Sequence, residues 1–262
     1  MASAVPWSAL KRFTPARVAL GRAGNGLPTA AHLAFQAAHA AARDEVGKAL
    51  DVAALARALA AARFASIAVR SAAEGRKTFL LRPDLGRALA EGEAGRLQAA
   101  ATAGAIAFVV ADGLAAEAVA AEAVKLLSRV VPALAREGLA VAPIVIAEQG
   151  RVALGDAVGA ALGAVAVAVL IGERPGLSAP RSMGVYLTWA PRPGRTDAER
   201  NCISNIRPGG LSSEAAAETL LWLIGEMRRR RVTGVALKDE RPGALPLEPQ
   251  RGALPLATPL GP

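Results

Sequence analysis

The chain has 262 residues, 53% of them hydrophobic and 20% charged, and carries a formal net charge of +9. A chain of this length and apolar content buries a sizeable core, which excludes general disorder. One cysteine excludes a disulfide framework and a cysteine-based zinc site, and two histidines leave little material for a histidine-rich metal centre.

Residues 1–62 are predicted to form a small helical N-terminal region. Two pairs, Thr14-Pro15 and Pro28-Thr29, are helix-start signals, because threonine caps a helix and proline is preset for its first turn. Helices are predicted over residues 30–46 and 51–62, the second capped by Asp51.

Both histidines lie in the first of these predicted helices. His32 and His39 are seven residues apart and therefore share one helix face. They are separated by about 10.5 Å along the helix axis, too far to bind one metal ion together. We expect packing or partner contact from them rather than metal binding.

Residues 63–240 are predicted to form an α/β domain, a mainly parallel five-stranded sheet flanked by helices in a Rossmann-like arrangement. Short apolar runs alternate there with helical stretches, the pattern of βαβ units. The strands are predicted over residues 65–70, 105–111, 141–147, 165–171 and 184–189, and the covering helices over residues 114–136, 154–162 and 213–231. The middle three strands are rich in Val, Ile and Ala, as expected where both faces of a sheet are covered.

The longest uncharged apolar run lies between Asp156 and Glu173. Its 16 residues fall short of the ~18 that a membrane span needs. Gly155, Gly159 and Gly163 recur every four residues, which favours a close approach of the local helix to a neighbour. The N-terminus lacks the continuous apolar stretch of a secretory signal, so we expect a soluble, cytoplasmic protein with no membrane partner.

Residues 241–262 have a different composition. Six of the 17 prolines lie there, and the phrase GALPL occurs twice, at 243–247 and 252–256. Such a segment is predicted to be a Pro-rich flexible tail without a packed core.

Carboxylates and glycines follow the three clearest strands. Asp112-Gly113 follows the first strand, Glu148 begins the loop after the second, and Gly172-Glu173 follows the third. Ligands of open parallel sheets bind beyond the carboxyl ends of the strands, where glycine lets the backbone approach them closely. The three acids are therefore predicted to converge on one rim, although Asp112 is equally well interpreted as a helix cap.

A second polar cluster spans residues 197–210. Asn201, Ser204 and Asn205 offer neutral donors and acceptors that suit a ligand fringed with amides, and they flank the only thiol, Cys202. Without a nearby histidine in the sequence, Cys202 is interpreted as a small buried hydrophobe rather than a nucleophile.

Six segments of the chain resemble the small subunit of ethanolamine ammonia-lyase. They are TPARVALGRAGNGLPT (14–29), SAAEGRKTFLLRPDLGR (71–87), VVADGL (109–114), QGRVALGDAVG (149–159), LIGERPGLSAPRSMGVYLT (170–188) and RNCISNIRPGGL (200–211). The resemblance covers roughly residues 6–238, and LIGERPGL with NCISNIRPGGL is its most specific part. It implies an adenosylcobalamin-dependent lyase that converts ethanolamine to acetaldehyde and ammonia by a radical mechanism.

The resemblance also implies that this chain is a non-autonomous subunit of a hetero-oligomer. A large barrel subunit would bind ethanolamine, and the small subunit would cover part of the cobalamin at the interface. Family cobalamin contacts correspond to Val152, Glu173 and Cys202, and no catalytic residue or metal ligand is assigned to this chain. Val152 would give apolar contact, Glu173 would accept hydrogen bonds from corrin amides, and Cys202 would pack or bond weakly.

Further expectations follow from the same comparison. Ser204 and Asn205 are additional candidates for cofactor contact. Neither histidine lies in the Asp-x-His-x-x-Gly context of a cobalt-ligating histidine, so the cofactor's own base is expected below cobalt. Family members packaged into bacterial microcompartments can carry an extended N-terminal segment, whereas five residues precede Pro6 here, which leaves encapsulation open.

Two other functions stay open from the residues alone. One is a self-sufficient α/β enzyme that uses Asp112, Glu148 and Glu173 around a divalent metal. The other is a scaffold or nucleic-acid protein, suggested only by the charge, which comes from 26 arginines and 5 lysines. No nucleic-acid motif supports it, so we expect no nucleic-acid partner and interpret the arginine run 228–231 as a solvated helix end or a subunit interface.

Overall fold

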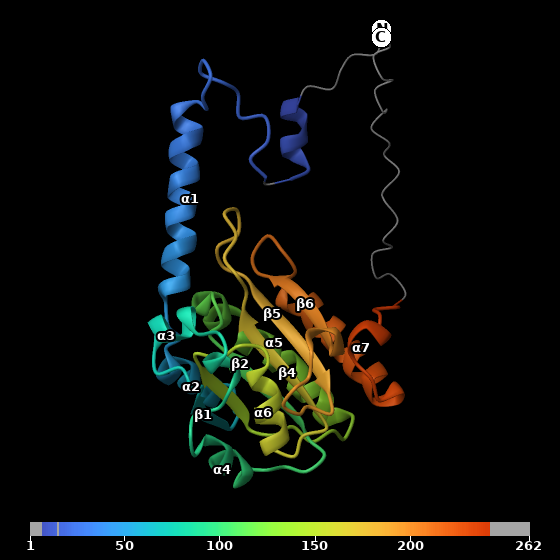
Figure 1. The fold of residues 1–262 in the computed structure, drawn as a ribbon. Coiled ribbons are helices and arrows are strands. Elements are labelled where there is room, and N and C mark those ends of the chain that lie inside the picture. The colour runs from blue at the N-terminus through green and yellow to red at the C-terminus, as the bar shows by residue number, and fades with distance from the viewer. Residues whose placement is uncertain (1–6, 15, 242–262) are drawn as a thin grey trace.

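Figure 1 shows the chain as a computed structural model, which describes residues 7–14 and 16–241. A six-stranded sheet forms its centre, and helices pack on both faces of the sheet, so the fold is α/β. The strands are β1 (Ser66–Arg70), β2 (Ile106–Ala111), β3 (Ile144–Glu148), β4 (Ala166–Gly172), β5 (Met183–Trp189) and β6 (Arg200–Ile206). The α-helices are α1 (Thr29–Gly47), α2 (Val52–Ala61), α3 (Arg76–Leu81), α4 (Glu93–Gln98), α5 (Ala116–Arg136), α6 (Leu154–Ala161) and α7 (Ser213–Arg230). Short 3-10 helices are η1 (Trp7–Arg12), η2 (Leu85–Arg87), η3 (Asp197–Glu199) and η4 (Gly234–Ala236).

The sheet has the strand order β1-β3-β2-β4-β5-β6. The first four strands in this order are parallel, β5 runs antiparallel to β4, and β6 runs antiparallel to β5. All five predicted strands are present, although β3 begins at Ile144 rather than at residue 141. Pro143 precedes it and has no N–H to donate to the sheet.

The prediction of five strands was one too few. The sixth strand, β6, consists of residues that were interpreted only as a polar cluster. It lies at the edge of the sheet, and its side chains alternate irregularly between buried and exposed positions. Because only one face of β6 is buried, its sequence lacks the continuous apolar run that marks the inner strands.

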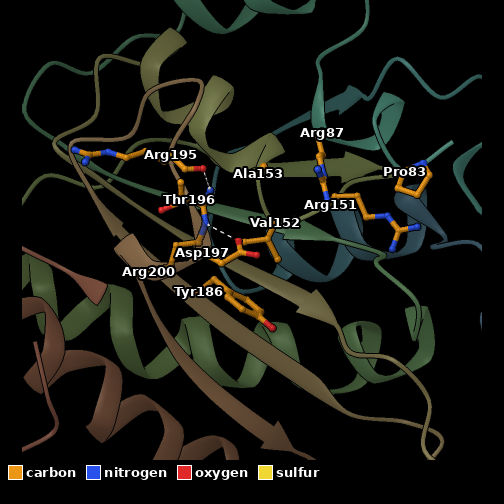
Figure 2. A pocket seen from close by; sticks show the side chains of 10 residues that line it. All are labelled: Pro83, Arg87, Arg151, Val152, Ala153, Tyr186, Arg195, Thr196, Asp197 and Arg200. Atoms are coloured by element: carbon orange, nitrogen blue, oxygen red, sulfur yellow. Dashed lines mark hydrogen bonds and ion pairs between the residues drawn. The ribbon is translucent and has the colours of Figure 1, made fainter. Parts of the chain in front are cut away.

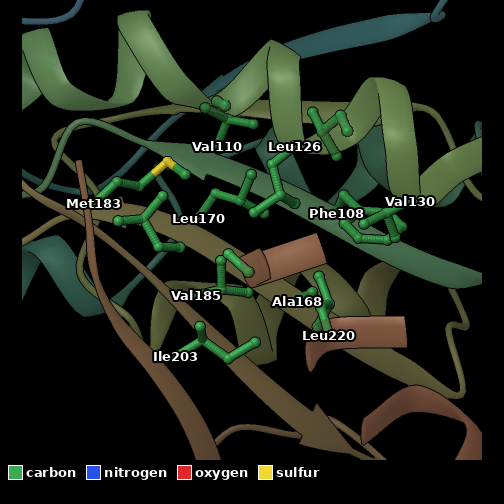
Figure 3. Close-up of a cluster of buried hydrophobic side chains, with 14 of the residues drawn as sticks. Phe108, Val110, Leu126, Val130, Ala168, Leu170, Met183, Val185, Ile203 and Leu220 are labelled. Atoms are coloured by element: carbon green, nitrogen blue, oxygen red, sulfur yellow. The ribbon is translucent and has the colours of Figure 1, made fainter. Parts of the chain in front are cut away.

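One face of the sheet packs against α2, α5 and α7. Figure 3 shows the centre of this core, where side chains of β2, β4, β5 and β6 meet those of α5 and α7. Leu55 and Leu59 of α2 belong to the same buried cluster. Asp51 caps α2 as predicted, because its carboxylate accepts a hydrogen bond of 2.8 Å from the backbone N–H of Ala54.

The opposite face is covered over β1 to β4 by α4 and α6. Leu97 of α4 and Leu154 and Val158 of α6 are fully buried in this second cluster. On β5 and β6 this face is covered only in part. Thr188 and Arg200 are buried beside Asp156 of α6, whereas Tyr186 is half-buried and Cys202 is exposed. We call the accessible part of this face, around Tyr186 of β5 and Cys202 of β6, the β5–β6 face.

The prediction that a helix starts at Thr14-Pro15 was wrong. In the described chain, residues 16–28 contain no helix, and the Thr14 hydroxyl instead accepts a hydrogen bond of 3.1 Å from the backbone N–H of Ala16. Ala19, Gly21 and Gly24 have φ values of +53°, +80° and +60°, which no right-handed helix accommodates.

Helix α1 projects from the rest of the molecule (Figure 1), and Ala42 and Glu45 near its C-terminal end are its buried residues. His32 and His39 are both exposed on it, and the His39 ring lies 6.5 Å from that of Phe35. The histidines therefore do not enter the core.

Two of the three regularly spaced glycines bring α6 close to its neighbours, as predicted. A Cβ atom at Gly155 would lie 2.2 Å from Val169 Cγ2 on β4, and one at Gly159 would lie 2.5 Å from Pro191 Cγ. Gly163 instead follows the helix with a φ of +63°, which glycine adopts without strain.

Replacing Gly155 with alanine is expected to destabilise the chain by about 1–3 kcal/mol, because the new methyl group overpacks the contact with Val169. Gly225 of α7 is the matched control, since a Cβ there would meet no atom within 4 Å. Gly225→Ala is expected to stabilise by about 0.5–1 kcal/mol through helix propensity. Urea unfolding of the purified variants measures both, and shifts of the same sign would contradict the packing argument.

Residues 242–262, which include almost all of the predicted tail, lie outside the described residues. The division into regions 1–62, 63–240 and 241–262 stays a prediction. Within the part of the chain that the structure describes, none of the helices is both long enough and apolar enough to cross a membrane.

Candidate functional site

Asp112 follows β2 but does not cap the next helix, since the N-cap of α5 is Ala115. Its buried carboxylate accepts hydrogen bonds of 3.0–3.1 Å from the backbone N–H groups of Gly113, Gln149 and Gly150. Arg76 of α3 adds an ion pair at 3.2 Å. Asp112 thus joins the end of β2 to the loop after β3, a structural role that leaves little acceptor capacity for a ligand.

Glu148 is the last residue of β3 and pairs in register with Arg70 of β1. Its side chain does not combine with the other two acids: among residues 7–14 and 16–241, no three His, Cys, Asp or Glu side chains gather closely enough to hold a metal ion. The three acids follow parallel strands and therefore share one edge of the sheet, as predicted, but they form no metal-binding group, because Asp112 bonds the backbone instead.

Glu173 follows β4 and joins the loop before β5 to strand β6. Its carboxylate accepts hydrogen bonds from the hydroxyls of Ser182 and Ser204 and from the backbone N–H of Asn205, the last at 3.1 Å. The register of β5 and β6 shifts here, which makes a bulge at Ser204 and Asn205, and Asn205 has a φ of +65°. The bulge frees the Asn205 N–H from the ladder, and Glu173 satisfies it.

A glycine makes room for the Glu173 carboxylate. A Cβ atom at Gly184 would lie 3.0 Å from Glu173 Oε1 and 3.3 Å from the ring of Tyr186. Any larger residue would push the carboxylate or the ring out of place. Gly184 therefore keeps a cradle open on the β5–β6 face between Glu173 and Tyr186.

Tyr186 and Cys202 are opposite each other in the register of β5 and β6. Burial raises the pKa of Tyr186 above its ordinary value, and the neighbouring Cys202 and Glu173 add to the rise. Desolvation likewise raises the pKa of the Cys202 thiol. Both groups are therefore protonated at neutral pH, so Cys202 is a poor nucleophile and serves as a weak, neutral hydrogen-bonding group.

Val152 lies just before α6 and lines a cavity of about 440 Å³ together with Tyr186. Figure 2 shows these two side chains at its centre, with Arg87 and Arg151 on one side and Arg195, Thr196 and Asp197 on the other. We call this cavity the arginine pocket, because four of its lining residues are Arg87, Arg151, Arg195 and Arg200.

A buried ion pair holds one wall of the arginine pocket in place. Arg200 of β6 donates two hydrogen bonds, of 2.8 and 2.7 Å, to the two carboxylate oxygens of Asp156 on α6. It also donates to the Thr188 hydroxyl at 3.0 Å and to the Arg195 carbonyl at 3.0 Å. This bidentate pair ties α6 to the edge strand and to the loop before it.

The three residues singled out from the sequence are distributed around Tyr186. Val152 shares the arginine pocket with it, Cys202 lies opposite it on β6, and Glu173 lies beside it across Gly184. Cys202 also lines a neighbouring groove along the edge of β6, and it is exposed rather than buried as interpreted from the sequence.

Sequence reasoning missed Tyr186 and Arg87. Tyr186 is the chain's only tyrosine and lies in an otherwise apolar strand, a signal that was available. Arg87 has no such signal, because 26 arginines are spread over the whole chain.

Comparison with known proteins identifies the family. Residues 4–238 match the family model described as "Ethanolamine ammonia-lyase light chain". Curated relatives named "Ethanolamine ammonia-lyase small subunit" include one from Azotobacter vinelandii, 55% identical over 239 residues, or 90% of this chain and 88% of the relative. Those from Ralstonia nicotianae and Pseudomonas syringae pv. tomato are 55% and 52% identical, over 89% and 91% of this chain and 88% and 85% of their own lengths.

The match spans most of the chain and nearly the whole length of these relatives. A small subunit implies a hetero-oligomer with a large subunit. The chain belongs to the family of ethanolamine ammonia-lyase small subunits and is therefore part of an ammonia-lyase complex.

Proposed function

We propose that this chain contributes part of an adenosylcobalamin site at the interface with the large subunit, where ethanolamine is converted to acetaldehyde and ammonia. The observation that carries the proposal is the β5–β6 face. There Val152, Glu173 and Cys202, from three separate segments, surround Tyr186 at the end of the sheet face that α4 and α6 leave accessible in the described chain. An accessible face with neutral donors and one carboxylate suits a broad ligand fringed with amides.

The polar and apolar groups of this face each suit such a ligand. A carboxylate has about four acceptor positions, and Glu173 uses three of them for Ser182, Ser204 and Asn205, which leaves about one for an amide N–H of the ligand. The protonated Tyr186 and Cys202 add no charge to the face. Val152, which lines the arginine pocket, supplies apolar contact.

The chemistry that adenosylcobalamin supplies when bound is radical generation by homolysis of its cobalt–carbon bond. This chain's residues bind and orient: Glu173 holds corrin amides, and Val152 and Cys202 pack against the ligand. His32 and His39 lie on α1, away from the residues that form the β5–β6 face. We therefore assign no ligand of the cobalt to this chain.

The large barrel subunit is proposed to bind ethanolamine and to cover surface that is exposed here. Trp7, Phe13, Leu33 and Phe35 are exposed apolar side chains of η1, the residue after it and the projecting α1, and the arginine run 228–231 ends α7. These are candidate contacts with the large subunit. A location inside a bacterial microcompartment stays a prediction of the family resemblance.

Co-expression with the large subunit tests the proposal. Equilibrium binding of cyanocobalamin and formation of acetaldehyde from ethanolamine are measured for the complex and for each subunit separately. We expect tight cobalamin binding and turnover by the complex only. Full turnover by this chain without the large subunit would contradict the proposal, as would a complex whose cobalamin affinity equals that of the large subunit by itself.

A further inference from the structure

The arginine pocket has an uneven distribution of charge. Arg200 is paired with Asp156, and Arg195 is paired with Glu199, so two of its four arginines are neutralised by neighbouring carboxylates. Asp197, the one acid in the lining, is itself 3.4 Å from Arg200 on that same side. Uncompensated positive charge is therefore confined to the side formed by Arg87 and Arg151.

Arg87 and Arg151 form no ion pair with any carboxylate in residues 7–14 and 16–241. Burial lowers the pKa of Arg151, and repulsion from Arg76 and Arg87 lowers it further. Three guanidinium groups thus act on one another, and Asp112, which is paired with Arg76, only partly offsets them. An anion bound between Arg87 and Arg151 would relieve this repulsion.

The Arg151 side chain is held rigidly in place. Its guanidinium lies 4.1 Å from the centre of the Phe79 ring and donates to the Phe79 carbonyl at 3.2 Å, and its backbone N–H donates to Gly86 at 2.8 Å. Its Nε atom is buried and has no hydrogen-bond partner in the described residues. A fixed, incompletely satisfied guanidinium costs little further entropy when it binds an anion.

The rest of the pocket indicates what kind of anion fits. Val152, Pro83 and the ring of Tyr186 give it apolar walls, so the anion is part of a larger organic molecule. The positive end of the α6 dipole lies at the same place, because the pocket includes Ala153, the N-cap of α6. The first N–H groups of α6 already donate to the carbonyls of Arg151, Val152 and Ala153, so the anion would be held by the two guanidinium groups, which favour a phosphate.

We propose that the arginine pocket binds the phosphodiester of the cobalamin nucleotide tail, with Arg87 and Arg151 as its charge partners. The assignment rests on the proposed cobalamin function and extends it to a separate part of the ligand. Glu173 and Cys202 face the amide-bearing corrin, and the arginine pocket, which Val152 connects to that face, takes the negatively charged tail.

The test compares two corrinoids on the complex of this chain with its large subunit. Cyanocobalamin carries the phosphodiester, whereas dicyanocobinamide lacks the phosphate and the nucleotide. The variants are Arg87→Gln, Arg151→Gln and, as a matched control, Arg57→Gln, an exposed arginine on α2 against the opposite face of the sheet. Arg87 makes no contact that the fold requires in the described chain, so Arg87→Gln remains informative even if Arg151→Gln fails to fold.

Each pocket variant is expected to weaken cyanocobalamin binding about tenfold, which corresponds to about 1.4 kcal/mol, and to leave dicyanocobinamide binding unchanged. Arg57→Gln should change neither affinity. Inorganic phosphate at high millimolar concentration should weaken cyanocobalamin binding in the wild type and less in the variants.

Three outcomes would overturn the assignment. If the variants lose affinity equally for both corrinoids, the pocket does not bind the phosphate. The same conclusion follows if cyanocobalamin binding is unchanged in both variants. If phosphate binds to the wild type and not to the variants while cyanocobalamin affinity stays the same in all of them, the pocket is a free-phosphate site. Failure of the wild-type complex to bind cyanocobalamin at all would instead refute the proposed function on which the inference rests.

Discussion

Replacing Asp156 with alanine is expected to destabilise the chain by about 3–5 kcal/mol, because it removes the buried counter-charge of Arg200 and leaves that guanidinium only the exposed Asp197, at 3.4 Å. The side chains of Asp156 and Arg200 are 1% and 2% exposed and make two short hydrogen bonds. Urea unfolding of the purified variant measures the loss, and the arginine pocket should lose its shape with it.

A control at the surface separates burial from charge. Glu226 pairs with Arg229 on α7, where the arginine side chain is 69% exposed, so Glu226→Gln should cost less than about 1 kcal/mol. The double variant Asp156→Leu with Arg200→Met should recover much of the stability, since apolar residues often replace a buried pair without net loss. Equal losses for Asp156→Ala and Glu226→Gln would show that the buried pair has no special role.

Replacing Glu173 with glutamine is expected to weaken cobalamin binding by the two-subunit complex about 10- to 100-fold. A hydrogen bond to a charged group contributes about 1.5–3 kcal/mol, and the glutamine amide also cannot accept from Ser182, Ser204 and Asn205 at once. Equilibrium titration with cyanocobalamin measures the affinity, and thermal unfolding of the same complex reports any accompanying loss of structure.

Glu148→Gln is the matched control, since Glu148 also lies at the carboxyl end of a parallel strand but outside the β5–β6 face. It should leave cobalamin affinity unchanged. A loss of activity as large in Glu148→Gln as in Glu173→Gln would favour the alternative in which the strand-end acids act together around a divalent metal, and would count against the cobalamin assignment.

The inner strands could be predicted from the sequence because both of their faces are buried, so nearly every residue in them is apolar. All six residues of β2 and all seven of β4 are buried, and both strands read as continuous apolar runs. The edge strand β6 could not be found in this way. Its two buried isoleucines, Ile203 and Ile206, are three residues apart, because the bulge at Ser204 and Asn205 interrupts the twofold alternation of a strand.

Ligands of parallel sheets bind beyond the carboxyl ends of the strands, and this tendency identified the loops that contain Glu173 and Asp112. It could not distinguish the roles of the two acids. Both are acids beside a glycine at the same edge of the sheet. The hydrogen-bond partners that distinguish them lie up to 38 residues away for Asp112 and 32 for Glu173. The strand order decides which backbone groups lie near each carboxylate. This order cannot be inferred from the sequence around either acid.

By itself the sequence determined the α/β class, the positions of the long helices and inner strands, and, through the resemblance of its motifs, the family. These follow from local periodicity, capping residues and short motifs of the chain, each of which lies within a short window of sequence. Only the tertiary structure decided that Asp112 is a structural acid, that Glu173 fills a bulge in β6, and that Asp156 pairs with Arg200. Such contacts join residues far apart in the chain, and their geometry depends on how the edge strands pack beside α6.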